Sequence, residues 1–312
     1  MGENMSLSVG GIGVEFLGEL DDGFEEGFRS LFARRYLPDV DDLRNEPRIV
    51  IERFKGDVFR VFGAVYDHPG RDSYKLESPV PSAYGNEAPI FFLLQASARA
   101  GAKLGRIFIT DSVAVVAPSG KALLFVGYPH TGKSTMSVLA LARGLTVLST
   151  ENTVVEVKED SLHVVGGTSV LVYDPRVEGI YDVEIPYDEE TRSGYRIKDL
   201  TDDKKRGKLL SKGVEVDMIV VLHSAFNCGE ASFSRVKGRK VRKTLWYFST
   251  ALLKGLDYYE PMPLHVPMND EIIENLNSFL TTASSGYSSR MLEAFGNHRA
   301  VFDRLMEMEG GP

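Results

Sequence analysis

Apolar and polar positions along the first hundred residues follow the periods of short strands and helices. Residues 5–17 alternate as a strand does, and residues 21–37 place four apolar side chains on one face of a helix. Two strand-like runs, 47–54 and 57–66, flank Lys55-Gly56, which predicts a hairpin. These patterns indicate a mixture of strands and helices with no long repeat.

The rest of this region completes a small unit. Residues 67–89 are rich in Pro, Gly, Ser and charged residues, which predicts a surface loop. An apolar pattern that opens with Pro89 predicts a helix ending near Gly101 or Gly105. We therefore expect residues 1–105 to form an N-terminal α+β unit.

From residue 106 onward the pattern changes to that of an α/β unit, which we expect to span residues 106–312. Residues 106–117 and 121–127 are β-branched and apolar, and a tight turn, Pro118-Ser119-Gly120, predicts that they pair as a hairpin. A helix-like run follows from residue 133 to Gly144. In the tail, two amphipathic helices are predicted within 268–280 and 288–307.

Composition narrows the classes of function. The formal net charge of −8 argues against nucleic acid as the main partner. The single cysteine, Cys228, excludes an intrachain disulfide and a multi-cysteine metal site. The sequence has no run of about 18 apolar residues, so no membrane span is expected. Residues 1–16 lack the pattern of a signal peptide. A cytoplasmic protein with no membrane partner is the expectation.

The stretch from Gly127 to Ser134, "GYPHTGKS", matches the phosphate-binding motif G-x-x-x-x-G-K-[ST] without deviation. Two glycines let the backbone curl so that its N–H groups surround one anion, and the following helix start adds further donors. The lysine carries a charge to the β- and γ-phosphates, and the serine hydroxyl can ligate Mg²⁺. The expected nucleotide contacts are Gly127, His130, Thr131, Gly132, Lys133, Ser134 and Thr135.

A motif of this kind needs acids nearby, and the sequence offers several. The apolar run 215–224 ends in His223 and Ser224, which are not acids. The run after the loop's helix, 144–157, instead carries Glu151, and Asp174 and Arg176 follow in "DPRVEGIYDV".

Residues 106–185 resemble the catalytic domain of HPr kinase/phosphorylase and its relatives with a phosphoenolpyruvate-carboxykinase-like fold. In that family a hairpin precedes the phosphate loop, and "STEN" at 149–152 stands where the family has "ADDN". "DPRVEGIYDV" aligns with a later family signature. The chain departs from the family at two positions. Thr150 replaces one of the family's two paired aspartates, and Thr110 replaces a histidine of the family.

The resemblance implies a phosphoryl-transfer enzyme that uses ATP and Mg²⁺. Lys133 is expected to hold the triphosphate, with Ser134 and Asp174 as the Mg²⁺ ligands. Glu151 is expected to accept the proton of the acceptor hydroxyl, with Asp111 as the alternative base. Arg176 is expected to neutralise charge on the transferred group.

Because no match to the protein-docking region of that family is found, the expected acceptor is a small hydroxylated molecule, such as serine or a sugar-like alcohol. Two alternatives stay open. One is a protein-serine kinase or phosphorylase, and the other is a non-catalytic nucleotide-binding switch. A homo-oligomer is compatible with the apolar tail, and the donor remains open among ATP, ADP, GTP and pyrophosphate.

Two charged segments have alternative interpretations. Residues 188–213 are predicted to be a solvated loop, or a lid that contributes Arg192, Arg196 or Lys198 to a closed site. Residues 235–243, "RVKGRKVRK", are predicted to be an exposed turn, or a site for an anionic substrate or partner.

Overall fold

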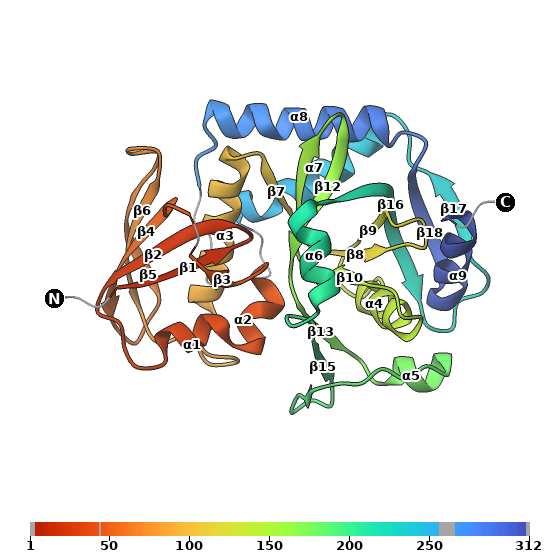
Figure 1. Cartoon of the computed structure of the whole chain (residues 1–312), viewed down its shortest axis with the longest axis horizontal. Helices are drawn as coiled ribbons and strands as arrows, with labels where there is room; N and C mark the ends of the chain where they lie inside the picture. Colours follow the sequence, from red (N-terminus) through yellow and green to blue (C-terminus); the bar gives the residue numbers. More distant parts are fainter. Residues whose placement is uncertain (1–3, 44, 256–265, 310–312) are drawn as a thin grey trace. The chain divides into compact units, whose positions relative to one another are not determined.

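The computed structural model describes residues 4–43, 45–255 and 266–309 (Figure 1). The chain divides into two compact units. The first comprises Met1–Arg106 with Ala251–Asn275, and the second comprises Ile107–Thr250 with Leu276–Pro312. Both contain strands and helices, so the prediction of a mixed α/β protein is confirmed.

The first unit has a six-stranded sheet in the order β3-β1-β2-β4-β6-β5. Its strands are β1 (Met5–Val9), β2 (Ile12–Gly18), β3 (Asp41–Asp42), β4 (Ile49–Lys55), β5 (Arg60–Val65) and β6 (Asp72–Ser78). Its helices are α1 (Phe24–Arg29), α2 (Leu31–Tyr36) and α3 (Ala88–Lys103). The predicted helix from residue 89 is thereby confirmed as α3.

Three predictions for this unit are wrong. Residues 5–17 form two antiparallel strands because Gly10 and Gly11 both have positive φ and make a turn. The predicted hairpin at Lys55-Gly56 is absent, since β4 and β5 each pair with β6. The third wrong prediction is the loop 67–89, because β6 lies within it.

A buried charge explains why the hydrophobic pattern of the sequence does not predict β6. Its inward residues include Asp72, which is almost fully buried and forms an ion pair of 2.6 Å with Arg99 of α3. A strand that buries a paired carboxylate does not show apolar alternation.

The second unit is built on a nine-stranded sheet in the order β10-β8-β9-β16-β12-β11-β7, with β18 paired to β16 and β17 paired to β18. The strands are β7 (Arg106–Ile109), β8 (Ser112–Val116), β9 (Ala122–Val126), β10 (Val147–Ser149), β11 (Thr153–Lys158), β12 (Ser161–Gly167), β16 (Val214–Ala225), β17 (Ser232–Arg235) and β18 (Met291–Asn297). A separate small sheet contains β13 (Val170–Tyr173), β15 (Arg196–Asp199) and β14 (Glu189–Glu190).

The remaining helices are α4 (Lys133–Ala142), α5 (Arg176–Tyr181), α6 (Lys204–Lys212), α7 (Arg239–Lys254), α8 (Asp270–Gly286) and α9 (His298–Glu309). The prediction of a second tail helix over 288–307 is therefore wrong in its first half. Residues 291–297 are β18, because the neighbouring strand β16 pairs with them in parallel. No helix among the described residues is long and apolar enough to cross a bilayer.

Strand direction sets the location of the candidate site. β9, β16 and β18 run parallel, and β10 runs the same way because both it and β9 are antiparallel to β8. The carboxyl ends of these four strands, and the start of β8, therefore meet at one edge of the sheet. Ligand sites of open α/β sheets form outside the carboxyl ends of their strands.

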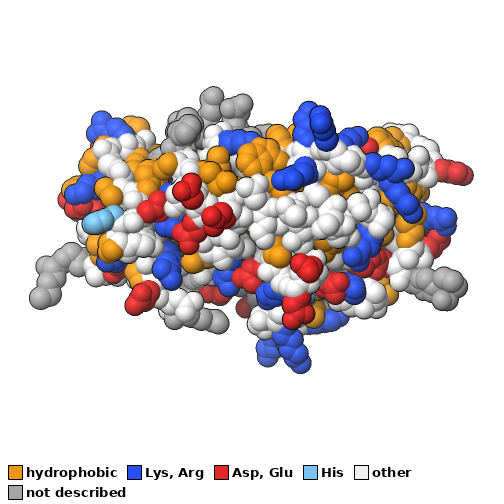
Figure 2. Space-filling view, turned by 90° about the horizontal axis from the view of Figure 1, so that it is seen from above, with side chains coloured by type: hydrophobic (Ala, Val, Ile, Leu, Met, Phe, Trp, Pro, Cys, Tyr) orange, Lys and Arg blue, Asp and Glu red, His pale blue; other side chains and the backbone are white. Residues whose placement is uncertain are grey.

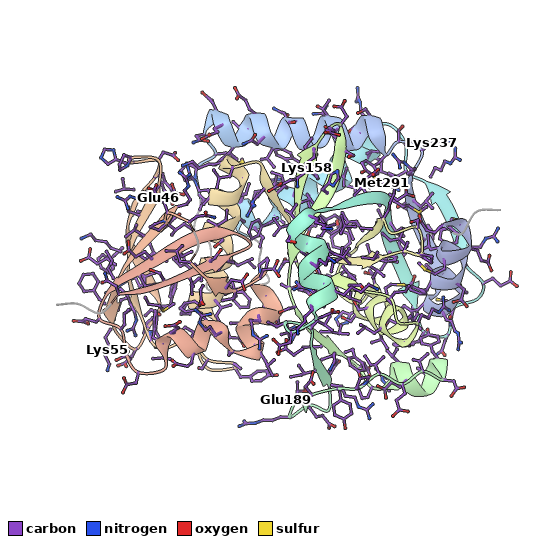
Figure 3. All side chains as sticks on the ribbon, in the orientation of Figure 1. Glu46, Lys55, Lys158, Glu189, Lys237 and Met291 are labelled. Atoms are coloured by element: carbon purple, nitrogen blue, oxygen red, sulfur yellow. The ribbon has the colours of Figure 1, made fainter. Side chains whose placement is uncertain are left out.

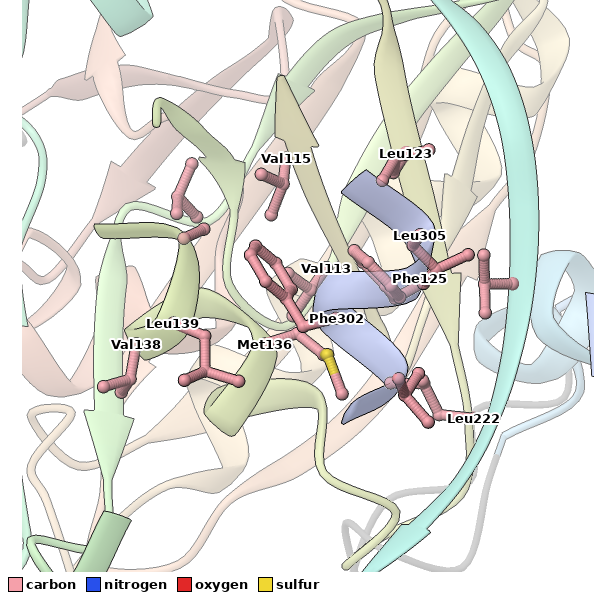
Figure 4. Close-up of a cluster of buried hydrophobic side chains, with 14 of the residues drawn as sticks. Val113, Val115, Leu123, Phe125, Met136, Val138, Leu139, Leu222, Phe302 and Leu305 are labelled. Carbon is pink, nitrogen blue, oxygen red and sulfur yellow. The ribbon is translucent and has the colours of Figure 1, made fainter. Parts of the chain in front are cut away.

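One face of this sheet is covered by α4 and α9, whose side chains form a buried apolar cluster with the strands (Figure 4). Phe125 of β9 and Leu222 of β16 point into this cluster, together with Met136 of α4 and Phe302 of α9. The cluster holds α4, and therefore the loop before it, against the sheet.

We predict that Phe125→Ala lowers the free energy of unfolding by about 3–5 kcal/mol, because it leaves a cavity in this core. Chemical denaturation followed by circular dichroism measures the change. The matched control is Ile180→Ala, whose side chain is half-exposed and should change stability by less than about 0.5 kcal/mol. Equal losses in both variants would contradict the assignment of the core.

Candidate functional site

The loop 127–134 joins the carboxyl end of β9 to the start of α4. Gly132, with φ of 98°, is the N-cap of α4, and no side chain caps this helix end. The first intrahelical bond runs from the Met136 amide to the Gly132 carbonyl at 3.0 Å. The amides of residues 133–135 therefore have no acceptor within the helix, and they form a donor cluster at its positive end.

Both glycines are required by close approaches. A side chain at Gly127 would meet the hydroxyl of Thr131 and the carbonyl oxygen of Leu222. A side chain at Gly132 would collide with the ring of His298. The loop thus has a backbone path that only glycine permits at these two points.

The Lys133 ammonium lies over the loop's own backbone. Its Nζ donates to the carbonyl oxygens of Gly127 at 2.6 Å and Tyr128 at 3.0 Å. It also lies 3.2 Å from Oδ1 of Asp111, and both side chains are more than 90% buried. The structure therefore brings together two of the predicted catalytic residues, Lys133 and Asp111.

Asp111 stands in a tight turn between β7 and β8, with φ of 51°. Its carbonyl accepts a hydrogen bond from the Gly127 amide at 3.2 Å. Burial raises the pKa of its carboxyl group although Lys133 opposes the shift. Its Oδ2 has no hydrogen-bond partner among the described residues, so this buried oxygen can accept a proton or a hydrogen bond.

Glu151 lies next to this turn. Its carbonyl accepts a hydrogen bond from the amide of Ser112 at 2.9 Å. The hydroxyl of Thr168 accepts hydrogen bonds from the amides of residues 150–152, which fixes the turn after β10. Both predicted bases, Glu151 and Asp111, therefore come from adjacent backbone at the same edge of the sheet.

Asp174 and Arg176 pair with each other. Asp174 Oδ1 accepts from the Arg176 amide at 2.9 Å, and Oδ2 accepts from its Nε at 2.8 Å. The guanidinium holds the pKa of Asp174 below its ordinary value. Ser134 and Asp174 offer the oxygen ligands that Mg²⁺ prefers, so the donor types fit. A metal ion here would share Asp174 with Arg176, and among the described residues no group of three or more His, Cys, Asp or Glu suits a metal.

The remaining predicted loop residues differ in exposure. His130 is exposed and has φ of 66°. Thr131 donates its hydroxyl hydrogen to the Tyr128 carbonyl at 2.8 Å, and its own carbonyl accepts from the Ser224 amide at 3.3 Å. Thr135 is buried in the first turn of α4.

Two residues that sequence reasoning did not assign also border the loop. Ser224, at the carboxyl end of β16, is buried, and its hydroxyl has no partner among the described residues. His298, directly after β18, is buried against Gly132, and its Nδ1 lies 2.8 Å from the Tyr181 hydroxyl. Nothing local in the sequence signals His298, because its place depends on how β18 pairs with β16.

Residues 188–213 contain β14, β15 and α6, so the predicted solvated loop is wrong. Tyr173 pairs with Arg196, which puts β15 beside β13, the strand that leads to Asp174. Arg196 is paired with Glu178, and Lys198 lies 3.2 Å from Asp188. Arg192 is exposed. These residues belong to the small sheet and its connections, where Figure 3 labels Glu189.

The basic run 235–243 surrounds the turn between β17 and α7. The Val236 amide donates to the carbonyl of Met291, the first residue of β18, so this turn lies at the amino end of that strand. Figure 3 labels Lys237 and Met291, and Figure 2 shows Lys and Arg side chains toward the same end of the molecule. The basic side chains of the run are exposed, but residues 239–243 begin α7 and do not form a turn. The run stands at the end of β18 opposite to the loop 127–134.

No family model matches the chain, and a search of curated proteins finds no match.

We predict that His298 makes stability depend on pH. Burial lowers its pKa from 6.5 to about 4. As pH falls from 6.5 to 4 the unfolded state binds a proton that the folded state does not. The free energy of unfolding therefore decreases over this window, by on the order of 3 kcal/mol for this group.

The measurement is chemical denaturation of wild type and His298→Gln between pH 7 and pH 4.5. Wild type should lose stability more steeply than the variant, because the variant has no imidazole to protonate. A difference between the two proteins that stays constant over the whole range would contradict the assignment.

Proposed function

We propose that this protein is a kinase that transfers the γ-phosphoryl group of ATP to a hydroxyl group of a small molecule. The observation that carries the proposal is the uncapped start of α4 behind two sterically required glycines, with Lys133 and Asp111 buried together beside it. A buried ion pair beside a cluster of amide donors is suited to a polyphosphate.

In the proposed complex the loop amides and Lys133 bind the β- and γ-phosphates. Lys133 then exchanges contacts with the loop carbonyls for contacts with phosphate oxygens. Arg176 neutralises charge on the transferred group. Mg²⁺, held by Ser134 and Asp174, supplies further charge neutralisation when it is bound.

We propose Asp111 rather than Glu151 as the base, which reverses the order expected from the sequence. Asp111 Oδ2 is buried and has no hydrogen-bond partner in the part of the chain that the structure describes, and burial raises the pKa of this carboxyl group. It accepts the proton of the acceptor hydroxyl while the hydroxyl oxygen bonds to the γ-phosphorus. The bond between that phosphorus and the β–γ bridging oxygen breaks, and ADP leaves with the electron pair. Glu151 then orients the acceptor.

The direct test is a screen of small hydroxylated metabolites for phosphoryl acceptors, with purified protein, ATP and Mg²⁺. We expect ADP release that depends on one class of metabolite. A phosphorylated protein band without a metabolite requirement would indicate a protein kinase. Nucleotide binding without turnover in any mixture would indicate a switch, and either result would refute the proposal.

We predict that Lys133→Ala weakens ATP binding by about 10- to 100-fold, because it removes charge-assisted hydrogen bonds to phosphate. Isothermal titration calorimetry measures the affinity, and circular dichroism checks the fold. The matched control is Lys208→Ala on the exposed surface of α6, which should bind ATP as wild type does. Unchanged affinity in a folded Lys133→Ala protein would exclude the loop as the phosphate site.

We predict that Asp111→Asn lowers kcat by about 10²- to 10⁴-fold and changes the ATP dissociation constant only a few-fold, because the amide cannot accept the proton. Glu151→Gln should lower kcat less. Steady-state kinetics with the identified acceptor measure both. Glu159→Gln, an exposed acid on the β11–β12 turn, serves as the control. A larger loss in Glu151→Gln than in Asp111→Asn would restore Glu151 as the base.

A further inference from the structure

Three partly exposed rings stand at the carboxyl ends of the parallel strands that flank the loop. They are Tyr128 after β9, His223 near the end of β16, and Phe295 in β18. Tyr128 is 49% exposed and Phe295 is 40% exposed. The His223 side chain is 34% exposed. We call these three residues the aromatic row.

His223 and Phe295 lie on the sheet face opposite α4 and α9, because Leu222 and Ala294 beside them belong to the cluster under those helices. Tyr128 packs on Tyr247 of α7, with ring centroids 5.2 Å apart. His223 stacks on Phe295 with centroids 4.7 Å apart and an interplanar angle of 10°. His223 Nε2 also lies 3.4 Å from Glu293, which accepts from Lys240 of α7 at 2.7 Å.

The strand register makes these rings neighbours of the loop. Val126 pairs with Val221 across β9 and β16, and His223 pairs with Phe295 across β16 and β18. Tyr128 follows Val126 by two residues and His223 follows Val221 by two, so both stand at the ends of neighbouring strands. Because adjacent strands lie about 4.8 Å apart, the aromatic row extends about 10 Å from the loop.

The carboxylates lie on the other side of the loop. Along the sheet edge the strand order is β10, β8, β9, β16, β18. Glu151 and Asp111 belong to the β10 and β8 side, whereas His223 and Phe295 belong to the β16 and β18 side. A triphosphate in the loop can thus point its γ-phosphate toward the carboxylates and its other end toward the rings.

We propose that the aromatic row binds the base of the nucleotide, so that the phosphoryl donor is a nucleoside triphosphate and not an inorganic polyphosphate. The inference rests on the proposed function, because it assumes that the loop binds phosphates. Aromatic rings stack on bases through their π-faces, and each such stack contributes measurably to affinity. Single exposed apolar residues are ordinary on a protein surface, but here a stacked pair, His223 and Phe295, and Tyr128 stand at neighbouring strand ends beside the proposed phosphate loop.

The rings on the opposite face of the sheet do not offer an equivalent surface. Phe226 packs against His298, with centroids 4.8 Å apart, and the Arg176 guanidinium lies 6.0 Å from its ring centroid. Tyr181 and His298 are buried. Tyr181 and His298 therefore offer no accessible ring face beside the loop.

The experiment compares ATP with inorganic tripolyphosphate, each with Mg²⁺, by isothermal titration calorimetry. Tripolyphosphate carries the same phosphate chain without a base. Wild type should bind ATP at least about 10-fold more tightly than tripolyphosphate. Tyr128→Ala and Phe295→Ala should each weaken ATP binding by about 5- to 100-fold and leave tripolyphosphate binding within twofold of wild type.

The variants are chosen so that one remains informative if the other disturbs the loop. Phe295 lies outside the loop, and Tyr128→Phe should keep the ATP affinity because the ring is retained. Phe62→Ala, a half-exposed ring in β5, is the matched control and should bind both compounds as wild type does.

Equal affinity of wild type for the two compounds would overturn the inference, as would variants that weaken both compounds alike. Either outcome leaves the loop as a phosphate site. If neither compound binds to wild type, the proposed function itself fails, and the inference fails with it.

Discussion

The parallel pairing of β16 with β9 on one side and β18 on the other is the constraint on which the candidate site depends. It brings the ends of three strands to one edge, and with them Gly127, Ser224 and His298. The apolar core enforces this register. A shift of β16 by one residue would turn Leu222 away from the cluster beneath α4 and α9 and would bring His223 into it.

The same edge concentrates the features that lower stability. Asp111 and His130 have positive φ although neither is glycine, and Gly132 has a φ of 98°. Asp111 and Lys133 are buried charges, and one carboxylate oxygen of Asp111 lacks a partner among the described residues. Strain and buried polar groups persist where the surrounding structure holds them, which is typical of functional sites. The tightly packed core of α4, α9 and the sheet provides that support.

The elements that could be predicted from the sequence are those whose signal is local. The helix α3, the β8–β9 hairpin and the helix after the loop all show their period and their turn residues within their own length. The single strand predicted over 106–117 is wrong, because a turn at Asp111 divides it into β7 and β8. Several strands could not be predicted, among them β6, β18, and the strands β14 and β15 within residues 188–213. The reasons for β6 and β18 are clear. β6 buries Asp72 against Arg99, and β18 forms because β16 lies beside it. In both cases a residue distant in sequence decides the local structure.

By itself, the sequence determined the local form of the loop 127–134, because eight contiguous residues contain both required glycines, the lysine and the helix start. The tertiary structure alone decided which groups surround it. It brought Asp111 to Lys133 and placed His298 against Gly132. The Asp111 and His298 contacts depend on strand order and register, which follow from burial of the whole apolar core and cannot be read from a short stretch of sequence.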